Sequence, residues 1–312
     1  MRRKIIIDTD PGTDDALALL WALAASAELE VLGIVAVAGN LPLALTEKNA
    51  RRVCELAGRP EVAVFAGCAR PLLRSPVAAA SVHGETGLGA LVLPEPSMPL
   101  QPRHGVDFLI DALREAAPDS ITLCALGPLT DIAVALAKAP DIVRRARELV
   151  IMGGARSELG NVTPAAEFNI YADPHAAAAV FASGIPLVLL PLDATHKVAS
   201  TPARIARLRA LGNKCGPAAA ALLTPPAVLP HRRYGLGWPL HDPCVIAYLL
   251  RPELFDGRLV NVAVETESPL TLGMTVVDWW GVTARPPNAR FIAETDAEGL
   301  YALLCEHIAR LP

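Results

Sequence analysis

The stretch KIIIDTDPGTDDALALL, residues 4–20, decides the fold that we expect. It begins with an apolar, β-branched run of strand length and ends in a segment rich in alanine and leucine, with an acidic segment between them. A short buried strand followed directly by a helix is typical of the first half of a βαβ unit. The stretch therefore predicts one strand of a parallel sheet and the helix that follows it.

The same alternation continues along the chain and predicts a single α/β domain over residues 1–312, with a central, mainly parallel sheet flanked by helices. Residues 212–239 interrupt it, because they are rich in proline and glycine and include the basic-aromatic run HRRY at 231–234. We expect this segment to be a mobile lid. The expected strands cover residues 4–8, 31–37, 62–65, 121–126, 149–152 and 187–190, and the expected helices cover 14–25, 46–57, 106–117, 129–138 and 243–250, with two more opening at Asp173-Pro174 and Ser200-Thr201-Pro202.

The composition points to a small-molecule partner. The 28 basic and 32 acidic residues give a formal net charge of -4, and no basic run offers a surface for nucleic acid or an anionic membrane. The apolar run after the basic N-terminus is too short for a signal peptide or a membrane span, so we expect a cytoplasmic protein. The six cysteines form no CxxC pair, which predicts reduced, mostly buried thiols and neither disulfides nor a zinc site.

Four carboxylates crowd into eight residues after the first expected strand, at Asp8, Asp10, Asp14 and Asp15. The helix dipole explains only about 0.3–1 kcal/mol for each acid in the first turn, and it leaves Asp10 unexplained. Carboxylates that converge at a strand end repel one another unless a cation neutralises them, and oxygen ligands suit Ca²⁺ or Mg²⁺. The cluster predicts a site for a hard metal ion, and the alternative is a helix cap with solvated acids.

A second polar group lies in the segment ELGNVTPAAEFNIYAD, residues 158–173, after the expected strand at 149–152. Asn161, Glu167 and Asn169 can all bind hydroxyl groups. Asparagines in loops more often form turns, so this segment alone indicates little. Asp173, which precedes a proline, is interpreted as a helix N-cap without a catalytic role.

Two further segments carry histidines. His241 and Asp242 precede the expected helix at 243–250, where either residue has the alternative role of a cap. His83 lies in the glycine-rich loop HGETGL, residues 83–88, and a lone loop histidine is more often a surface group than a catalyst.

Together these segments resemble the nucleoside hydrolase family, whose marks are a DTDPGxDD opening, an AGN segment, an HGxxGL loop, an NxTxxAEFNxxxDP segment and a late HDP. The sequence has all five, in order, between residues 7 and 243, including AGN at 38–40. The resemblance implies an α/β fold around a mainly parallel sheet, and assembly as a homodimer or homotetramer. It also implies hydrolysis of the N-glycosidic bond of purine and pyrimidine ribonucleosides.

The resemblance implies a Ca²⁺ ion bound by the side chains of Asp10, Asp15 and Asp242 and by the main-chain carbonyl of Leu126. Many relatives have threonine at the position of Leu126, a departure that a carbonyl ligand tolerates. The resemblance also assigns the ribose contacts: the 2′ and 3′ hydroxyls to Asp14, Asn40, Asn169 and Asp242, the 5′ hydroxyl to Asn161 and Glu167, and the packing under the sugar to Met152.

Cleavage of this bond builds positive charge on the ribose and negative charge on the base, so it needs a water nucleophile, acidic surroundings and a leaving-group acid. Asp10, beside the expected ion, is the candidate general base. His241 is the candidate leaving-group acid, with His83 in a lesser role. Tyr234, in the expected lid, is a candidate contact for the base.

Two alternatives stay open at this point. A haloacid-dehalogenase-like phosphatase would use Asp8 in the Asp8-Thr9-Asp10 loop with Mg²⁺, but the sequence has no convincing later GDxxxD pair. A non-catalytic ribose- or nucleoside-binding protein would keep the hydroxyl contacts without needing both a metal cluster and a leaving-group histidine. A metal between Asp10 and Asp242 would distinguish the hydrolase from both.

Overall fold

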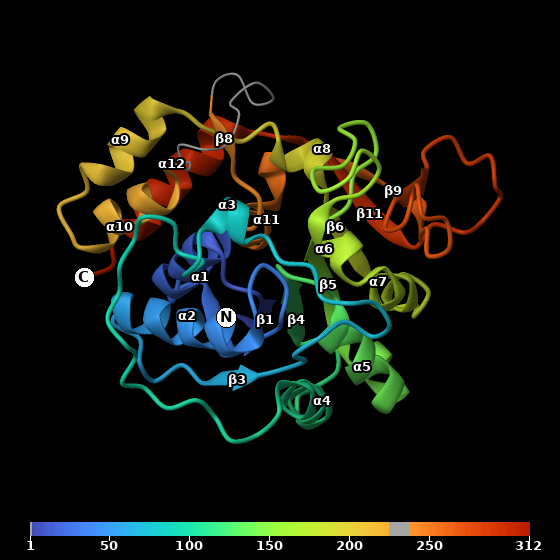
Figure 1. The fold of residues 1–312 in the computed structure, drawn as a ribbon, viewed down its shortest axis with the longest axis horizontal. Helices are drawn as coiled ribbons and strands as arrows, with labels where there is room; N and C mark the ends of the chain where they lie inside the picture. The colour runs from blue at the N-terminus through green and yellow to red at the C-terminus, as the bar shows by residue number, and fades with distance from the viewer. Residues whose placement is uncertain (1, 225–236) are drawn as a thin grey trace.

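A nine-stranded sheet runs through the computed structural model, which describes residues 2–224 and 237–312 (Figure 1). Seven neighbouring strands are parallel, and β9 and β10 add an antiparallel edge. The predicted α/β fold with a mainly parallel sheet is therefore confirmed. The order across the sheet is β10 (Thr275–Asp278), β9 (Phe255–Val264), β11 (Ala289–Thr295), β6 (Leu187–Leu190), β5 (Ala146–Met152), β4 (Ile121–Ala125), β1 (Arg3–Thr9), β2 (Leu29–Ala36) and β3 (Val64–Ala66).

Helices cover both faces of this sheet, which explains the continuous apolar runs of its strands. In β1, Ile5 and Ile7 belong to the core on one face, and Ile6 belongs to the core on the other. Helices on the first face are α1 (Thr13–Ala24), α2 (Leu43–Leu56), α10 (Cys215–Leu222), α11 (Pro243–Leu250) and α12 (Ala297–Ile308), and those on the second are α4 (Gly105–Glu115), α5 (Thr130–Lys138) and α7 (Pro174–Phe181).

Short elements complete the fold. They are α3 (Ala80–His83), η1 (Pro140–Arg144), α6 (Phe168–Ala172), α8 (Leu192–Thr195), α9 (Pro202–Arg209), η2 (Pro252–Leu254) and the two-stranded pair β7 (Ala199–Ser200) and β8 (Trp238–Pro239). Residues 212–239 were expected to form an irregular lid. Part of this segment is instead the helix α10, which is largely buried and packs on α9 and α1. Residues 225–236 of the segment lie outside the described part of the chain, so the lid stays a prediction.

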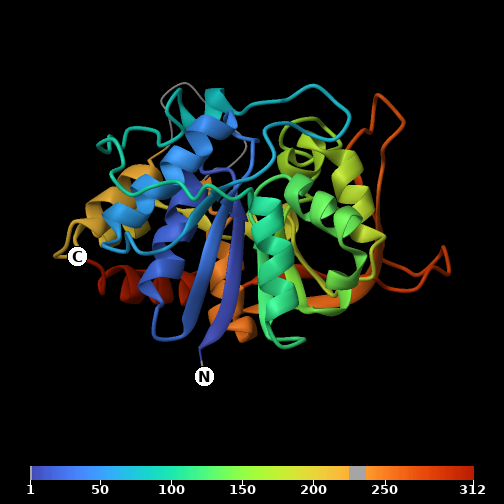
Figure 2. The same cartoon turned by 90° about the horizontal axis from the view of Figure 1, so that it is seen from below.

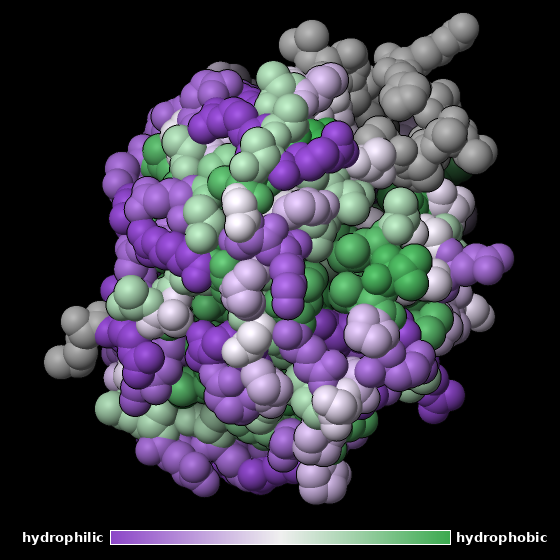
Figure 3. All heavy atoms as spheres, turned by 90° about the vertical axis from the view of Figure 1, so that its left-hand side faces the viewer, coloured by the Kyte–Doolittle hydropathy of each residue, from purple (hydrophilic) through white to green (hydrophobic). Residues whose placement is uncertain are grey.

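The carboxyl ends of the parallel strands meet at one edge of the sheet, where open α/β sheets bind ligands. In Figure 2, α3 (teal) lies above the carboxyl ends of β1 and β2 (blue). The face that carries α2, α9 and α10 is a mixture of polar and apolar areas (Figure 3). Within residues 2–224 and 237–312, no helix is both long and apolar enough to cross a membrane. All six cysteines are free thiols, as predicted.

Candidate functional site

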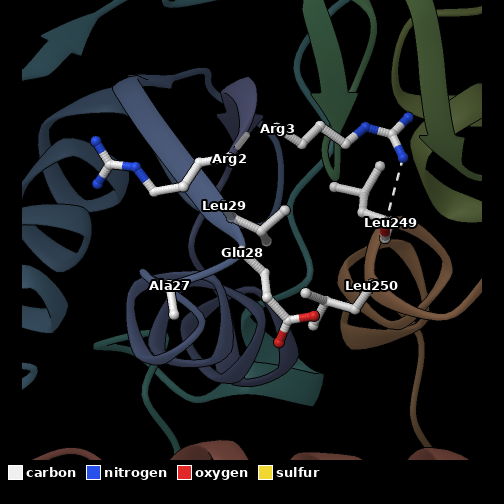
Figure 4. Close-up of a pocket in the computed structure, with 7 residues that line it drawn as sticks. All are labelled: Arg2, Arg3, Ala27, Glu28, Leu29, Leu249 and Leu250. Carbon is white, nitrogen blue, oxygen red and sulfur yellow. Dashed lines mark hydrogen bonds between the residues drawn. The ribbon is translucent and has the colours of Figure 1, made fainter.

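Two cavities of about 470 Å³ each lie at the two ends of the sheet. The amino-end cavity is formed by the start of β1, the loop before β2 and the end of α11 (Figure 4). Its polar groups are engaged, because Arg3 donates hydrogen bonds to the Thr122 hydroxyl and the Leu249 carbonyl, and Glu28 accepts one from Arg251 at 2.7 Å. These polar groups are paired with other protein groups, which does not indicate a catalytic site.

The carboxyl-end cavity is lined by polar and apolar residues from several separate segments of the chain. Ten of the residues singled out in the sequence line it: Asp14, Asn40, His83, Leu126, Met152, Asn161, Glu167, Asn169, His241 and Asp242. Asp10 and Asp15 lie beneath them and are fully buried. Tyr234 lies outside the described residues. The loops thus converge on one cavity although they are far apart in the sequence.

Asp15 is the most strongly held carboxylate of the floor. Its Oδ1 accepts hydrogen bonds from the Thr9 hydroxyl at 2.6 Å and the Asp10 amide at 3.2 Å. Its Oδ2 accepts from the Gly12 amide at 3.0 Å and the Asn40 side chain at 3.1 Å. The turn between β1 and α1 therefore folds around this side chain, which is why the motif needs an acid at the first turn of α1.

Asp10 is held on one side only. Its Oδ2 accepts a hydrogen bond from the Asn40 amide at 2.6 Å, whereas its buried Oδ1 has no partner among the residues described. Two glycines leave room for the carboxylate: a Cβ at Gly39 would lie 2.1 Å from Oδ2, and a Cβ at Gly127 would lie 2.5 Å from Oδ1. A buried, unpartnered carboxylate oxygen is unfavourable unless a ligand completes it.

Carboxylate oxygens of Asp14, Asp15 and Asp242 lie within 4.8 Å of one another. Asp242 occupies the N-cap position of α11 without making a side-chain capping bond, so its carboxylate is available to this group. Burial first, and then neighbouring carboxylates, raises the pKa of Asp10, Asp15 and Asp242. These groups can all ionise only if a cation joins them, and a donor set of carboxylate oxygens fits a hard metal ion.

Asp14, expected at the ribose, also belongs to this carboxylate group, and Asp10 lies close to Asp15. The Leu126 carbonyl faces the same region and accepts a hydrogen bond from the Asn169 side chain at 2.6 Å. The full set of expected metal ligands stays a prediction.

Glu167 and its neighbours form another wall of the cavity. Glu167 caps α6, with Oε1 accepting from the Asn169 amide and Oε2 from the Gly154 amide, each at 2.9 Å. Burial raises the pKa of Glu167 to about 7. The Asn161 side chain accepts from the Phe168 amide at 2.9 Å, which leaves its amide group for a ligand. This wall therefore offers several groups that bind hydroxyls.

Two histidines line the cavity, of which His83 is buried and His241 is partly buried. The Nδ1 atom of His83 accepts a hydrogen bond from the Thr13 amide at 3.1 Å, and Nδ1 of His241 lies 2.8 Å from the Thr195 hydroxyl. Burial, followed by the nearby His196 and His83, lowers the pKa of His241 to about 3. His241 is therefore neutral at pH 7 in the free site and carries a single ring N–H.

The positions of Asp173 and Asp8 test two interpretations of the sequence: a helix N-cap at Asp173 and a phosphatase nucleophile at Asp8. Asp173 accepts from the Ala176 amide at 3.1 Å and from the Thr130 hydroxyl at 2.8 Å, so its predicted role as an N-cap is confirmed. Asp8, the nucleophile of the phosphatase alternative, is 1% exposed and does not line the cavity. Burial and the neighbouring Asp131 raise the pKa of Asp8. A buried carboxyl group that favours its protonated form is a poor nucleophile and cannot contact a substrate in the cavity.

The sequence analysis did not identify some of the residues around the cavity as candidates for the site. Phe168 and Trp238 line it, and Thr195 contacts His241 from the short helix α8. Phe168 lies between Glu167 and Asn169, two candidates for the site, so its place in the sequence could have indicated that it lines the cavity. Neither Trp238 nor Thr195 belongs to a motif, so only the tertiary fold brings them to the cavity.

Comparison with known proteins agrees with this geometry. A family model described as inosine-uridine preferring nucleoside hydrolase matches residues 5–302. An uncharacterized protein of Schizosaccharomyces pombe is 52% identical over 99% of this chain and 100% of its own, and the pyrimidine-specific ribonucleoside hydrolase RihA of Salmonella gallinarum is 45% identical over 99% of each chain.

Solved structures extend the agreement to three dimensions. The purine-preferring ribonucleoside hydrolase of Gardnerella vaginalis superposes with a TM-score of 0.88, at 31% identity over 98% of each chain. The chain therefore belongs to the nucleoside hydrolase family, and its reaction is the hydrolysis of ribonucleosides at the N-glycosidic bond.

Proposed function

We propose that this hydrolase uses Asp10 to activate water and His241 to assist the departing base, with Ca²⁺ as its metal ion and pyrimidine ribonucleosides as its preferred substrates. The observation that carries the proposal is that one cavity is lined by carboxylates and by two histidines, with further buried carboxylates next to it. Acidic groups stabilise the ribosyl cation that develops as the bond breaks, and N–H donors stabilise the base that leaves with the electron pair.

Asp10, Asp15, Asp242 and the Leu126 carbonyl would hold the Ca²⁺ ion. When bound, the ion supplies the positive charge that lets these carboxylates ionise together, and it polarises a water molecule. Asp10 then takes the proton of the attacking water, a role supported by its free Oδ1 atom. The adjacent Asp14 has a carboxylate within reach of the same centre.

The remaining polar groups orient the sugar. Asp14, Asn40, Asn169 and Asp242 bind the 2′ and 3′ hydroxyls, and Asn161 and Glu167 bind the 5′ hydroxyl at the other wall. Met152, whose side chain lies against Asn169 in the floor, packs under the ribose. These contacts hold C1′ over the water nucleophile and supply the positional part of the catalysis.

His241 donates a hydrogen bond from its ring N–H to the departing base, which leaves with the electron pair of the N-glycosidic bond, and His83 donates a second hydrogen bond there. His83 fits this lesser role because its Nδ1 accepts from a backbone amide, which leaves Nε2 as the protonated nitrogen of the neutral ring. Tyr234 is proposed as a further contact to the base. We also propose a homodimer or homotetramer in the cytoplasm, in keeping with the family resemblance.

The preference for pyrimidines rests on the relatives. RihA of Salmonella gallinarum, named as pyrimidine-specific, shares 45% identity over 99% of each chain, whereas the purine-preferring Gardnerella vaginalis enzyme shares 31%. The test is release of free ribose from uridine, cytidine, inosine and adenosine, compared by kcat/KM. Higher values for uridine and cytidine support the preference, and a higher value for inosine or adenosine contradicts it. No release from any of them would refute the reaction itself.

A further inference from the structure

We infer that Thr195 is a positioning residue for this reaction: its hydroxyl donates a hydrogen bond to Nδ1 of His241 and keeps the ring proton on Nε2, directed to the base. The inference deepens the proposed function and rests on the proposed contact between His241 and the base. Thr195 ends α8, belongs to no sequence motif and is 46 positions from His241.

The direction of this hydrogen bond follows from the burial of Thr195. Its side chain is 0% exposed, and Oγ1 lies 2.8 Å from Nδ1 of His241. In the part of the chain that the structure describes, this is the only hydrogen bond recorded for the hydroxyl. If Oγ1 accepted a proton from Nδ1, its own O–H would be buried without an acceptor, which is unfavourable. The hydroxyl therefore donates, and Nδ1 is the unprotonated nitrogen.

The surroundings of α8 keep Thr195 in this position. Asp193, earlier in the same helix, accepts hydrogen bonds from the amides of Arg156 and Ser157, both at 2.8 Å. The ring of His196, the next residue after Thr195, lies 5.7 Å from the His241 ring at an angle of 56°, and its Nδ1 lies 2.9 Å from Glu158 Oε2. The imidazole of His241 is thus bounded by Thr195 on one side and by His196 on another.

His83 provides an internal comparison. Its Nδ1 accepts a hydrogen bond from the Thr13 amide, and a backbone amide can only donate. A neutral His83 therefore also carries its proton on Nε2. Two threonines from different elements, one by its amide and one by its hydroxyl, fix the same tautomer in the two histidines of the cavity. A base that leaves with the electron pair of the N-glycosidic bond then meets N–H donors and no lone pair from either ring.

The variant Thr195→Val tests the role of the hydroxyl, because it keeps the shape of the side chain. We expect kcat for uridine to fall by about 10–100-fold, the scale on which loss of a partner that orients a functional histidine acts. Hydrolysis of nitrophenyl riboside, whose leaving group needs no proton, should fall far less. Thr195→Ser restores the hydroxyl and should recover most of the activity on uridine. Thr122→Val, which removes another buried hydroxyl at the opposite end of the sheet, is the matched control and should leave kcat unchanged.

Nitrogen NMR of the wild-type protein with labelled histidine reads the tautomer directly, with the His241 signals identified by their loss in His241→Gln. We expect an unprotonated Nδ1 and a protonated Nε2 for His241, and loss of this single tautomer in Thr195→Val. A proton on Nδ1 overturns the inference, as do equal losses on both substrates in Thr195→Val or failure of Thr195→Ser to recover uridine hydrolysis.

These outcomes are distinguishable from failure of the proposed function. If His241→Ala reduces the hydrolysis of uridine and nitrophenyl riboside equally, the leaving-group role of His241 fails whatever the tautomer is. If His241→Ala affects uridine selectively while Thr195→Val does not, the role of His241 holds and that of Thr195 is refuted.

Discussion

The two cavities of this enzyme have the same volume and lie at the two ends of one sheet, yet only one has the properties of a catalytic site. At the amino end, arginines and Glu28 form ion pairs and hydrogen bonds that satisfy their charges. At the carboxyl end, Asp10 has a buried oxygen without a partner among the described residues, and three carboxylates converge. Unsatisfied charge, rather than volume, distinguishes the site.

The strongest test of this difference is removal of the metal ion. We expect exhaustive chelation to abolish ribose release and added Ca²⁺ to restore it, because the converging carboxylates need a cation to ionise together. Elemental analysis of the treated protein verifies that the sample is free of metal. Full activity in such a sample would contradict the proposed metal dependence.

Asp10→Asn removes the proposed base while keeping the size of the side chain. We expect kcat to fall by about 10²-fold or more, on uridine and on nitrophenyl riboside alike, because both reactions need an activated water. Circular dichroism should show an unchanged fold, since the Asn40 amide can still donate to the side-chain oxygen. An active Asp10→Asn enzyme would require another base.

His241→Ala should affect one substrate more than the other. We expect hydrolysis of inosine and uridine to fall by about 10²–10⁴-fold, the range for a positioned acid, and that of nitrophenyl riboside to fall far less. If His241 only braces Asp242, both classes of substrate should suffer together, because the metal and ribose contacts would be disturbed alike. In that case His83 is the next residue to substitute.

The stability of the metal-free protein should decrease as the pH rises from 4.5 to about 7. Burial raises the pKa of Glu167 from 4.5 to about 7, so the folded state binds more protons than the unfolded state between these values. The raised pKa values of Asp10, Asp15 and Asp242 act in the same direction. Melting temperatures measured across this range should fall, and Ca²⁺ should reduce the fall. Glu167→Gln should make the pH dependence shallower, and a rising melting temperature in the metal-free protein would contradict the argument.

The smallest effect is expected at the amino-end cavity. Arg2 is exposed there and lies 3.5 Å from Glu30, so Arg2→Ala should change the free energy of unfolding by no more than about 0.5 kcal/mol. Its kcat for uridine should equal that of the wild-type enzyme. A clear loss of activity in Arg2→Ala would mean that the two ends of the sheet are coupled.

The sequence predicted the parallel part of the fold closely, because strands buried on both faces appear as continuous apolar runs. The strand Leu187–Leu190 and the helix Pro243–Leu250 have the bounds that were expected. The antiparallel edge formed by β9 and β10 was not anticipated. Residues of β9 alternate irregularly between buried and exposed positions, so the strand has neither a continuous apolar run nor a strict period of two.

In the candidate site, too, residues from a local motif could be predicted, whereas residues placed by tertiary packing could not. Asp10, Asp14 and Asp15 were found because one turn supplies all of them within six residues. The position of Thr195 depends on how α8 packs beside the start of α11, and no local pattern encodes that packing. The proximity of Asp14 to Asp15 and Asp242 likewise depends on side-chain directions that a sequence motif does not specify.

The two glycines that flank Asp10 limit how this enzyme can evolve or be engineered. Gly39 and Gly127 come from different loops, and a methyl group at either one would overlap a carboxylate oxygen of Asp10. Even alanine at one of these positions is therefore compatible only with a displaced or shorter side chain at position 10. Mutant libraries aimed at new base preferences should therefore hold both glycines constant.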